Sequence, residues 1–157
     1  MADPENTMTL ETTKGDVVIE MRPDLAPGHV ARIKELVREG FYDGIVFHRV
    51  IDGFMAQTGD PTGTGMGGSK LPDVQAEFSN THYDPGTVGA ARSQDPNSFN
   101  SQFFITFADA GFLDGQYTVF GKVVAGMDVV NKIKKGDPQS GEMQDPDKII
   151  SAKIVDK

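Results

Sequence analysis

Two polar side chains in residues 47–60 have the means to do chemistry beside an apolar surface. Arg49 lies within a short strand-prone run, and Gln57 closes a second run that begins with Phe54 and Met55. A guanidinium is rarely buried, because removing its charge from water costs free energy unless it is paired. Two interpretations follow: Arg49 is simply solvated on a surface strand, or it is a cationic fork at the rim of an apolar pocket, with Gln57 as a second polar group.

Residues 101–107 show a similar mixture of polar and apolar side chains. Because successive side chains of a strand point to opposite faces, Phe103 and Ile105 share one face, which is an ordinary core face. Gln102 and Phe104 then share the other face. The segment therefore has the mixed character already seen in residues 47–60.

The same alternation bears on the role of His48. If Phe47 and Arg49 share one face of a strand, His48 lies on the opposite face with Val50. A hydrolase would need His48 within reach of a nucleophile and a third group to orient it, and the sequence has no nucleophile elbow. We therefore predict that His48 is a packed or hydrogen-bonded structural histidine.

Neither a metal site nor a nucleotide site is indicated. His29 and His82 stand in unrelated contexts, and the chain has no cysteine. Residues 60–69 are rich in glycine, a composition that can cradle phosphate groups. However, no Lys-Ser/Thr pair closes this loop in P-loop fashion, and no apolar helical pattern follows it. The loop is instead predicted to be a flexible wall beside a binding groove.

Length, charge and composition exclude several other classes. A chain of 157 residues is expected to form one domain, residues 1–157. A net charge of -8 argues against a general binder of nucleic acid or anionic membranes. No apolar run approaches the roughly 20 residues of a membrane helix, and the acidic start does not resemble a signal peptide. We expect a cytoplasmic protein, although a periplasmic protein whose signal peptide had been removed would look the same.

The 18 glycines, the 9 prolines and the small number of helical patterns predict a β-rich domain. One helix is expected to begin at Pro27 and to stop at Gly40, and a second to follow Asp128 as its N-cap. The runs that favour strands are 7–12, 17–21, 47–51, 54–57, 74–78, 86–91, 101–107, 117–124 and 149–155. About eight strands with two helices are typical of a closed antiparallel barrel whose ends the helices cap.

Five motifs follow one another along the chain: FHRVI at residues 47–51, GFMAQ at 53–57, SQFFI at 101–105, FLDG at 112–115 and VFGKV at 119–123. In this order they resemble a cyclophilin-type peptidyl-prolyl cis-trans isomerase of the compact bacterial form. The resemblance spans nearly the whole chain. It implies a closed eight-stranded antiparallel β-barrel capped by two α-helices. It also implies an enzyme that rotates X-Pro peptide bonds without a metal or cofactor. Its partners would be proline-containing peptides and unfolded or folding proteins, and a monomer is the default expectation.

The resemblance also implies roles for individual residues. Arg49 would donate a hydrogen bond to the prolyl nitrogen of the twisted amide, and Gln57 would orient Arg49 or the substrate carbonyl. Phe54 would complete the catalytic set. The pocket for the proline ring would be lined by Phe54, Met55, Phe104 and Leu113. The groove for the residues before proline would be lined by Ala91, the backbone of Arg92 and Gln102, beside a wall around Thr64 and Gly65.

Two positions depart from the animal members of the family, which commonly carry Trp where Phe112 stands and His where Tyr117 stands. Both residues are expected to remain at the pocket rim, but Phe112 lacks the indole N–H donor. We therefore expect weak binding of the family's inhibitor cyclosporin, with isomerase activity largely kept.

Two alternative functions stay open. One is a binding module or chaperone that needs no turnover, and the other is a purely structural domain, which leaves the mixed faces unexplained.

Overall fold

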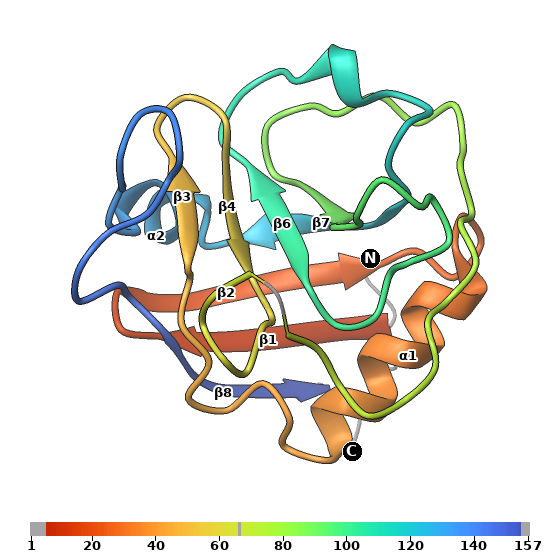
Figure 1. Cartoon of the computed structure of the whole chain (residues 1–157), viewed down its shortest axis with the longest axis horizontal. Coiled ribbons are helices and arrows are strands. Elements are labelled where there is room, and N and C mark those ends of the chain that lie inside the picture. Colours follow the sequence, from red (N-terminus) through yellow and green to blue (C-terminus); the bar gives the residue numbers. More distant parts are fainter. Residues whose placement is uncertain (1–5, 66, 155–157) are drawn as a thin grey trace.

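The computed structural model describes residues 6–65 and 67–154. Its strands form one antiparallel eight-stranded sheet in the order β3-β4-β6-β5-β7-β2-β1-β8 (Figure 1). The mainly β class and the number of strands are thus as the sequence predicts. The elements are β1 Thr7–Thr12, β2 Gly15–Met21, α1 Pro27–Arg38, β3 Arg49–Ile51, β4 Met55–Thr58, β5 Thr87–Ala90, β6 Phe103–Thr106, the 3-10 helix η2 Gly111–Leu113, β7 Val119–Ala125, α2 Met127–Lys132 and β8 Ile149–Ile154.

Side-chain alternation along β1 and β2 decides what they bury. Met8 lies opposite Ile19 and Leu10 opposite Val17 across the hairpin, and each of these side chains is at most 1% exposed. Burying one such side chain contributes roughly 1.5–3 kcal/mol. The same core cluster contains Val50 of β3. The core therefore directly supports the strand that carries the predicted catalytic arginine.

The sheet is open between β3 and β8, so the predicted closed barrel is wrong in this respect and the sheet forms a half-barrel. Closure would require the outer edge of β3 to pair with the next strand. That edge bonds to a loop instead: the Val50 N–H donates to the Gly141 carbonyl (3.0 Å), and the Gly136 N–H donates to the Val50 carbonyl (2.8 Å). The two sides of the opening approach each other just before these strands, where the Phe47 N–H donates to the Asp147 carbonyl (2.8 Å).

The two helices lie at opposite ends of the molecule, α1 against β8 and β7 and α2 against β2 (Figure 1). Pro27 occupies the first turn of α1, and the chain leaves this helix at Gly40 with a φ of +75°, as the sequence predicts. Asp128 is not the N-cap of α2, because Gly126 holds that position in the left-handed conformation. Asp128 follows in the first turn, where its charge still favours the helix dipole. Within the described residues, neither helix has the length and apolar character required to span a bilayer.

The segment between β4 and β5 is held by side chains rather than by a strand. The predicted strand at 74–78 is reduced to one isolated bridge between Val74 and Phe99. The reason is that its backbone donors bond elsewhere: the Ala76 N–H donates to Asn97 Oδ1 (2.9 Å). The segment therefore follows side-chain anchors that alternation cannot reveal.

One of these anchors closes the N-terminus of α1. The Glu77 carboxylate accepts the Gly28 N–H (3.1 Å) and the His29 N–H (2.9 Å), and it lies 2.6 Å from His29 Nδ1. The first N–H groups of a helix have no partner within it, and a negative charge there also favours the helix dipole. Glu77 thus joins the long segment to α1.

Candidate active site

A cavity of about 600 Å³ lies where β3, β4 and β6 meet the loops around them. Its volume falls in the range of pockets that bind small ligands. Nine of the residues that the sequence assigns to the site line it: Arg49, Phe54, Met55, Gln57, Ala91, Arg92, Phe104, Leu113 and Tyr117. Residues that are far apart in the sequence are therefore brought together here.

Strand register puts the central side chains in one row. Arg49 of β3 lies opposite Gln57 of β4, and Gln57 lies opposite Phe104 of β6. Directly opposed residues of neighbouring strands point to the same face, so the three side chains are neighbours. The row continues to Gly89 of β5, where a Cβ would lie 2.3 Å from Tyr83 Oη. Glycine at this position leaves room for the tyrosine ring.

A directed series of hydrogen bonds fixes the amides beside this row. Gln102 Nε2 donates to the carbonyls of Gly65 (3.0 Å) and Gly67 (2.9 Å), which leaves its Oε1 as an acceptor. Gln57 Nε2 donates to that Oε1 (2.9 Å), and Gln57 Oε1 accepts from Arg49 Nη1 (3.3 Å). Carbonyl oxygens only accept, so turning either amide over would set acceptor against acceptor. The glycine-rich loop thereby determines how Gln57 addresses Arg49.

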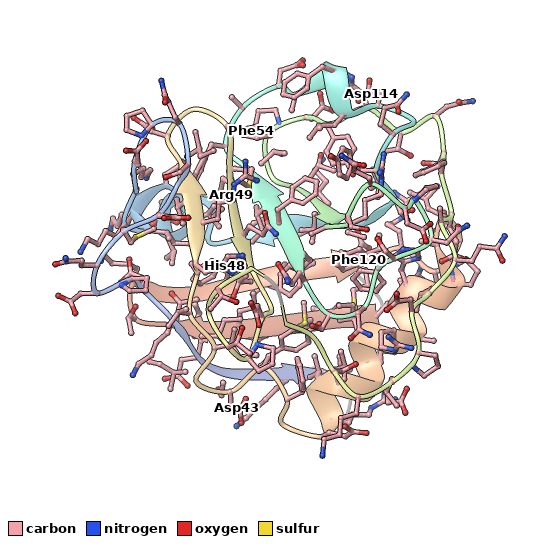
Figure 2. All side chains as sticks on the ribbon, viewed as in Figure 1. Asp43, His48, Arg49, Phe54, Asp114 and Phe120 are labelled. Carbon is pink, nitrogen blue, oxygen red and sulfur yellow. The ribbon has the colours of Figure 1, made fainter. Side chains whose placement is uncertain are left out.

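Arg49 is fixed at two points and keeps one nitrogen for a ligand. Its Nε donates to the Ser140 carbonyl (3.3 Å), and its Nη1 donates to Gln57. Within residues 6–65 and 67–154, Nη2 has no hydrogen-bond acceptor, and no carboxylate forms an ion pair with Arg49. Figure 2 labels Arg49 and Phe54 in the region of β3 and β4, and both side chains line the cavity. Of the two interpretations, the cationic fork at the rim of an apolar pocket is the one that this geometry favours.

Apolar side chains form another wall of the cavity, backed by a second, smaller core. Met55, Phe104 and Leu113 are each no more than 6% exposed. Behind them the Tyr83 ring stacks on Phe104 with centroids 5.8 Å apart, and its hydroxyl donates to the Tyr117 carbonyl (2.9 Å). The cavity thus offers a rigid apolar surface next to a cationic donor, a combination that can hold a ring and address a polar group attached to it.

A second cavity of about 340 Å³ adjoins the first. Gln102 lines this second cavity and not the first. The Arg92 guanidinium lies over the Tyr117 ring, 4.7 Å from its centroid, and its Nε donates to the Gln116 carbonyl (3.0 Å). The two cavities lie next to each other, because both are lined by Gln57, Gly65, Ala91 and Arg92.

His48 does not lie on the side that alternation predicts. β3 begins at Arg49, so the residues before it are outside the ladder: Phe47 joins the core with Val50, whereas His48 lines the cavity. Both ring nitrogens are buried and have no hydrogen-bond partner in the part of the chain that the structure describes. Burial lowers the pKa of His48 despite the attraction of Asp60. A neutral ring bonded to no nucleophile fits the predicted structural role and offers no catalytic triad.

The carboxylate of Asp60 fills the glycine-rich loop. It accepts the N–H groups of Thr62 (2.8 Å), Thr64 (3.0 Å) and Gly65 (2.5 Å). Burial opposes its ionisation, but the hydrogen bonds from Thr62, Gly67 and Gly65 outweigh burial and hold the pKa of Asp60 well below its ordinary value. Converging backbone N–H groups can bind phosphate. Here they bind the chain's own carboxylate, so the loop is a wall of the cavity and not a phosphate cradle.

This geometry can be compared with known proteins. The family model described as "Cyclophilin type peptidyl-prolyl cis-trans isomerase/CLD" matches residues 7–154. The chain belongs to this cyclophilin family. Curated relatives agree with the assignment. The probable peptidyl-prolyl cis-trans isomerase of Brucella suis biovar 1 (strain 1330) is 60% identical over an alignment of 165 positions, and this alignment covers 98% of this chain and 84% of the relative. Peptidyl-prolyl cis-trans isomerase cypE of Dictyostelium discoideum is 40% identical over 152 residues, covering 94% and 97%.

Solved cyclophilin structures share the fold. Cyclophilin AquaCyp293 from Hirschia baltica superposes with a TM-score of 0.88 at 32% identity, over 98% of this chain and 75% of that one. A Cryptosporidium parvum cyclophilin, crystallised in the presence of the dipeptide Ala-Pro, superposes with a TM-score of 0.88 at 30% identity, over 96% and 99%. This cyclophilin is therefore an enzyme, a peptidyl-prolyl cis-trans isomerase.

Phe112 lies at the rim of the cyclophilin cavity rather than in its wall. Its ring is 5.5 Å from that of Phe54, it remains 72% exposed, and it is absent from the residues that line the cavity. An exposed aromatic ring at this place can cover the edge of a bound ligand. Contact of Phe112 with substrate stays a prediction.

The sequence gives no signal for four residues that shape the cavity. Tyr83 backs Phe104 from a segment without strand character. Ser140, Glu142 and Met143 line the cavity from residues 135–148, which read as a polar loop. Their placement depends on the pairing of this loop with the edge of β3, and loop pairing of that kind has no periodicity.

Proposed function

We propose that this cyclophilin accelerates rotation about X-Pro bonds by using Arg49 to stabilise the twisted amide, without a covalent intermediate. Amide resonance sets an uncatalysed barrier of about 18–20 kcal/mol. The prolyl nitrogen is a poor acceptor in the planar amide and a better one when its lone pair is released by twisting. A hydrogen bond from Arg49 therefore strengthens in the transition state, and only such differential binding lowers the barrier. The observation that supports this mechanism is the Arg49 Nη2 left without an acceptor among the described residues, beside the apolar wall.

The substrate class we propose is proline-containing segments of peptides and of folding proteins. The apolar wall formed by Phe54, Met55, Phe104 and Leu113 would hold the proline ring. The adjoining cavity would take the residues before proline. The use of Ala-Pro with the Cryptosporidium parvum relative supports this class.

The decisive measurement is isomerisation of a short X-Pro peptide, followed by NMR exchange, for the wild type, Arg49→Ala and Arg49→Lys. We expect both variants to lose about 10²-fold or more in kcat, the scale typical of removing one preorganised donor. Arg22→Ala is the matched control, because Arg22 forms an exposed ion pair with Asp24 and does not line the cavity. If Arg49→Ala kept full activity, Arg49 would not have the proposed role. If the wild type did not accelerate isomerisation, the proposed mechanism would be wrong.

A binding or chaperone role in the same groove is the second candidate, since an exposed aromatic rim favours peptide capture. Refolding of a client limited by prolyl isomerisation separates the roles. If Arg49→Ala still assists refolding fully, holding rather than isomerisation assists the client. The expected monomer can be tested by light scattering and the expected cytoplasmic location by fractionation.

A further inference from the structure

His82 bridges two carboxylates on the surface behind the apolar wall of the cavity. Its Nδ1 lies 2.5 Å from Asp114 Oδ2, and its Nε2 lies 2.8 Å from Asp109 Oδ2. Asp84 is the third acidic group at the ring, with Oδ1 3.7 Å from Nε2. The ring is thus flanked by acidic side chains from its own segment and from both sides of η2.

The geometry requires a doubly protonated ring. Ionised carboxylates only accept hydrogen bonds, so both ring nitrogens must carry a proton for both contacts to form. The hydrogen bonds to Asp109 and then to Asp114 raise the pKa of His82 to about 9. His82, Asp84 and Asp109 also bring their ligand atoms within 4.8 Å of one another. Because both ring nitrogens already face carboxylates, this cluster is an ion-pair network rather than a set of metal ligands.

The two carboxylates hold opposite ends of η2. Asp109 Oδ1 accepts the Gly111 N–H (3.0 Å) at the start of this short helix. Asp114 follows the helix, and its Oδ1 accepts the Tyr83 N–H (2.8 Å). The ring also lies against the backbone between them: a Cβ on Gly111 would be 2.9 Å from His82 Cε1. Figure 2 places Asp114 at this helix, beyond Phe54.

The helix held in this way carries Leu113, a wall of the cavity, and Phe112, its rim. We propose that the His82 imidazolium is a positioning residue, which clamps η2 through Asp109 and Asp114 and so fixes Leu113 and Phe112 for the proline ring. The proposal rests on the proposed function of the cavity. His82 touches no substrate and acts through η2 alone, so it should govern substrate binding and leave the Arg49 chemistry unchanged.

The test compares KM and kcat for an X-Pro peptide in the wild type and in His82→Gln between pH 6 and pH 10. At pH 7 the variant should show a KM about two- to five-fold higher with kcat unchanged, the scale of one exposed charge pair. The wild-type KM should rise towards that of the variant as pH passes about 9. The raised pKa keeps His82 protonated below that pH, and the clamp is lost when the ring loses its proton. The variant should lack this pH step. Arg22→Gln removes an exposed ion-paired cation elsewhere and should keep both the wild-type KM and the step.

An NMR titration reports on the His82 ring in the folded wild type, so its result depends neither on how well a variant folds nor on turnover. The ¹³Cε1 resonance of His82, assigned by its loss in His82→Gln, should titrate near pH 9, and the Leu113 methyl resonances should shift with it. A ring that titrates near 6.5, an unchanged KM in His82→Gln, or a loss confined to kcat would overturn the proposal. If the wild type does not isomerise the peptide, the proposed function is wrong. The clamp can still be tested in that case, by comparing the Kd of the same peptide and the Leu113 shifts between the wild type and His82→Gln.

Discussion

Replacing Gly141 with alanine should displace Arg49 and slow isomerisation while the protein stays folded. Gly141 has a φ of +77°, and a Cβ built there would lie 2.7 Å from Arg49 Cγ and 3.0 Å from Val50 N. The first contact is with the stem of the proposed catalytic side chain, and the second is with the backbone of β3. Since Val50 belongs to a packed strand, the loop around Gly141 and the Arg49 stem must both move.

The magnitude follows from the contacts that this movement strains. The left-handed conformation costs an alanine about 1–2 kcal/mol. The hydrogen bonds from the Val50 N–H to the Gly141 carbonyl and from Arg49 Nε to the Ser140 carbonyl contribute roughly 0.5–1.5 kcal/mol each. We expect a loss of roughly 2–5 kcal/mol in the free energy of unfolding. A shift of Arg49 by about 1 Å should also lower kcat by about 10²-fold.

The assay pairs urea unfolding with NMR exchange of an X-Pro peptide, and Gly44→Ala is the matched control. Gly44 has a φ of +83°, but a Cβ there meets nothing within 4 Å. It therefore reports backbone strain alone, which should lower stability by about 1–2 kcal/mol with full activity. If Gly141→Ala loses no more stability than Gly44→Ala and keeps its kcat, Gly141 does not position Arg49 and the reasoning fails.

Three further predictions concern other parts of the molecule. Glu77→Ala should lower the free energy of unfolding by about 1–2 kcal/mol, because it uncaps α1; an unchanged urea midpoint would contradict this. The lowered pKa of Asp60 should stabilise the protein above pH 4 and lose that effect as pH falls further; in Asp60→Asn, urea midpoints should lack this component of the acid dependence. Wild type should bind cyclosporin weakly, and Phe112→Trp should tighten binding up to about tenfold by adding an N–H donor; equal affinities in calorimetry would count against that account.

The sequence alone predicts the local part of the site. Arg49 and Gln57 are equally far along the chain from Gly53, which lies in the turn between β3 and β4, and the register sets them opposite each other. Gln102 and Phe104 have mixed character for the same local reason, since alternation depends only on neighbouring residues. These positions follow from periods that the sequence contains.

Alternation fails where a strand begins later than its apolar run. Phe47, Val50 and Ile51 suggest a continuous strand, yet the ladder starts at Arg49, and His48 turns into the cavity. The closed barrel fails for a related reason. The prediction of a closed barrel rests on strands alone, whereas the edge of β3 forms its hydrogen bonds with the backbone of Gly136 and Gly141. A loop can satisfy a strand edge without any apolar pattern that would announce it.

The remaining contacts join segments that no local pattern relates, and they decide how well the local motif can work. The hairpin brings Arg49 beside Gln57, but the direction of the Gln57 amide depends on Gln102 and through it on the Gly65 carbonyl. On the apolar side, η2 is fixed by His82 from a segment before β5. Without these loops, the same residues would still supply a hydrogen-bond donor and an apolar wall, but neither would be held in a fixed orientation toward the substrate. The proposed mechanism, in which the Arg49 hydrogen bond strengthens only in the twisted state, requires this orientation, because a misplacement of about 1 Å can cost 10²-fold in rate.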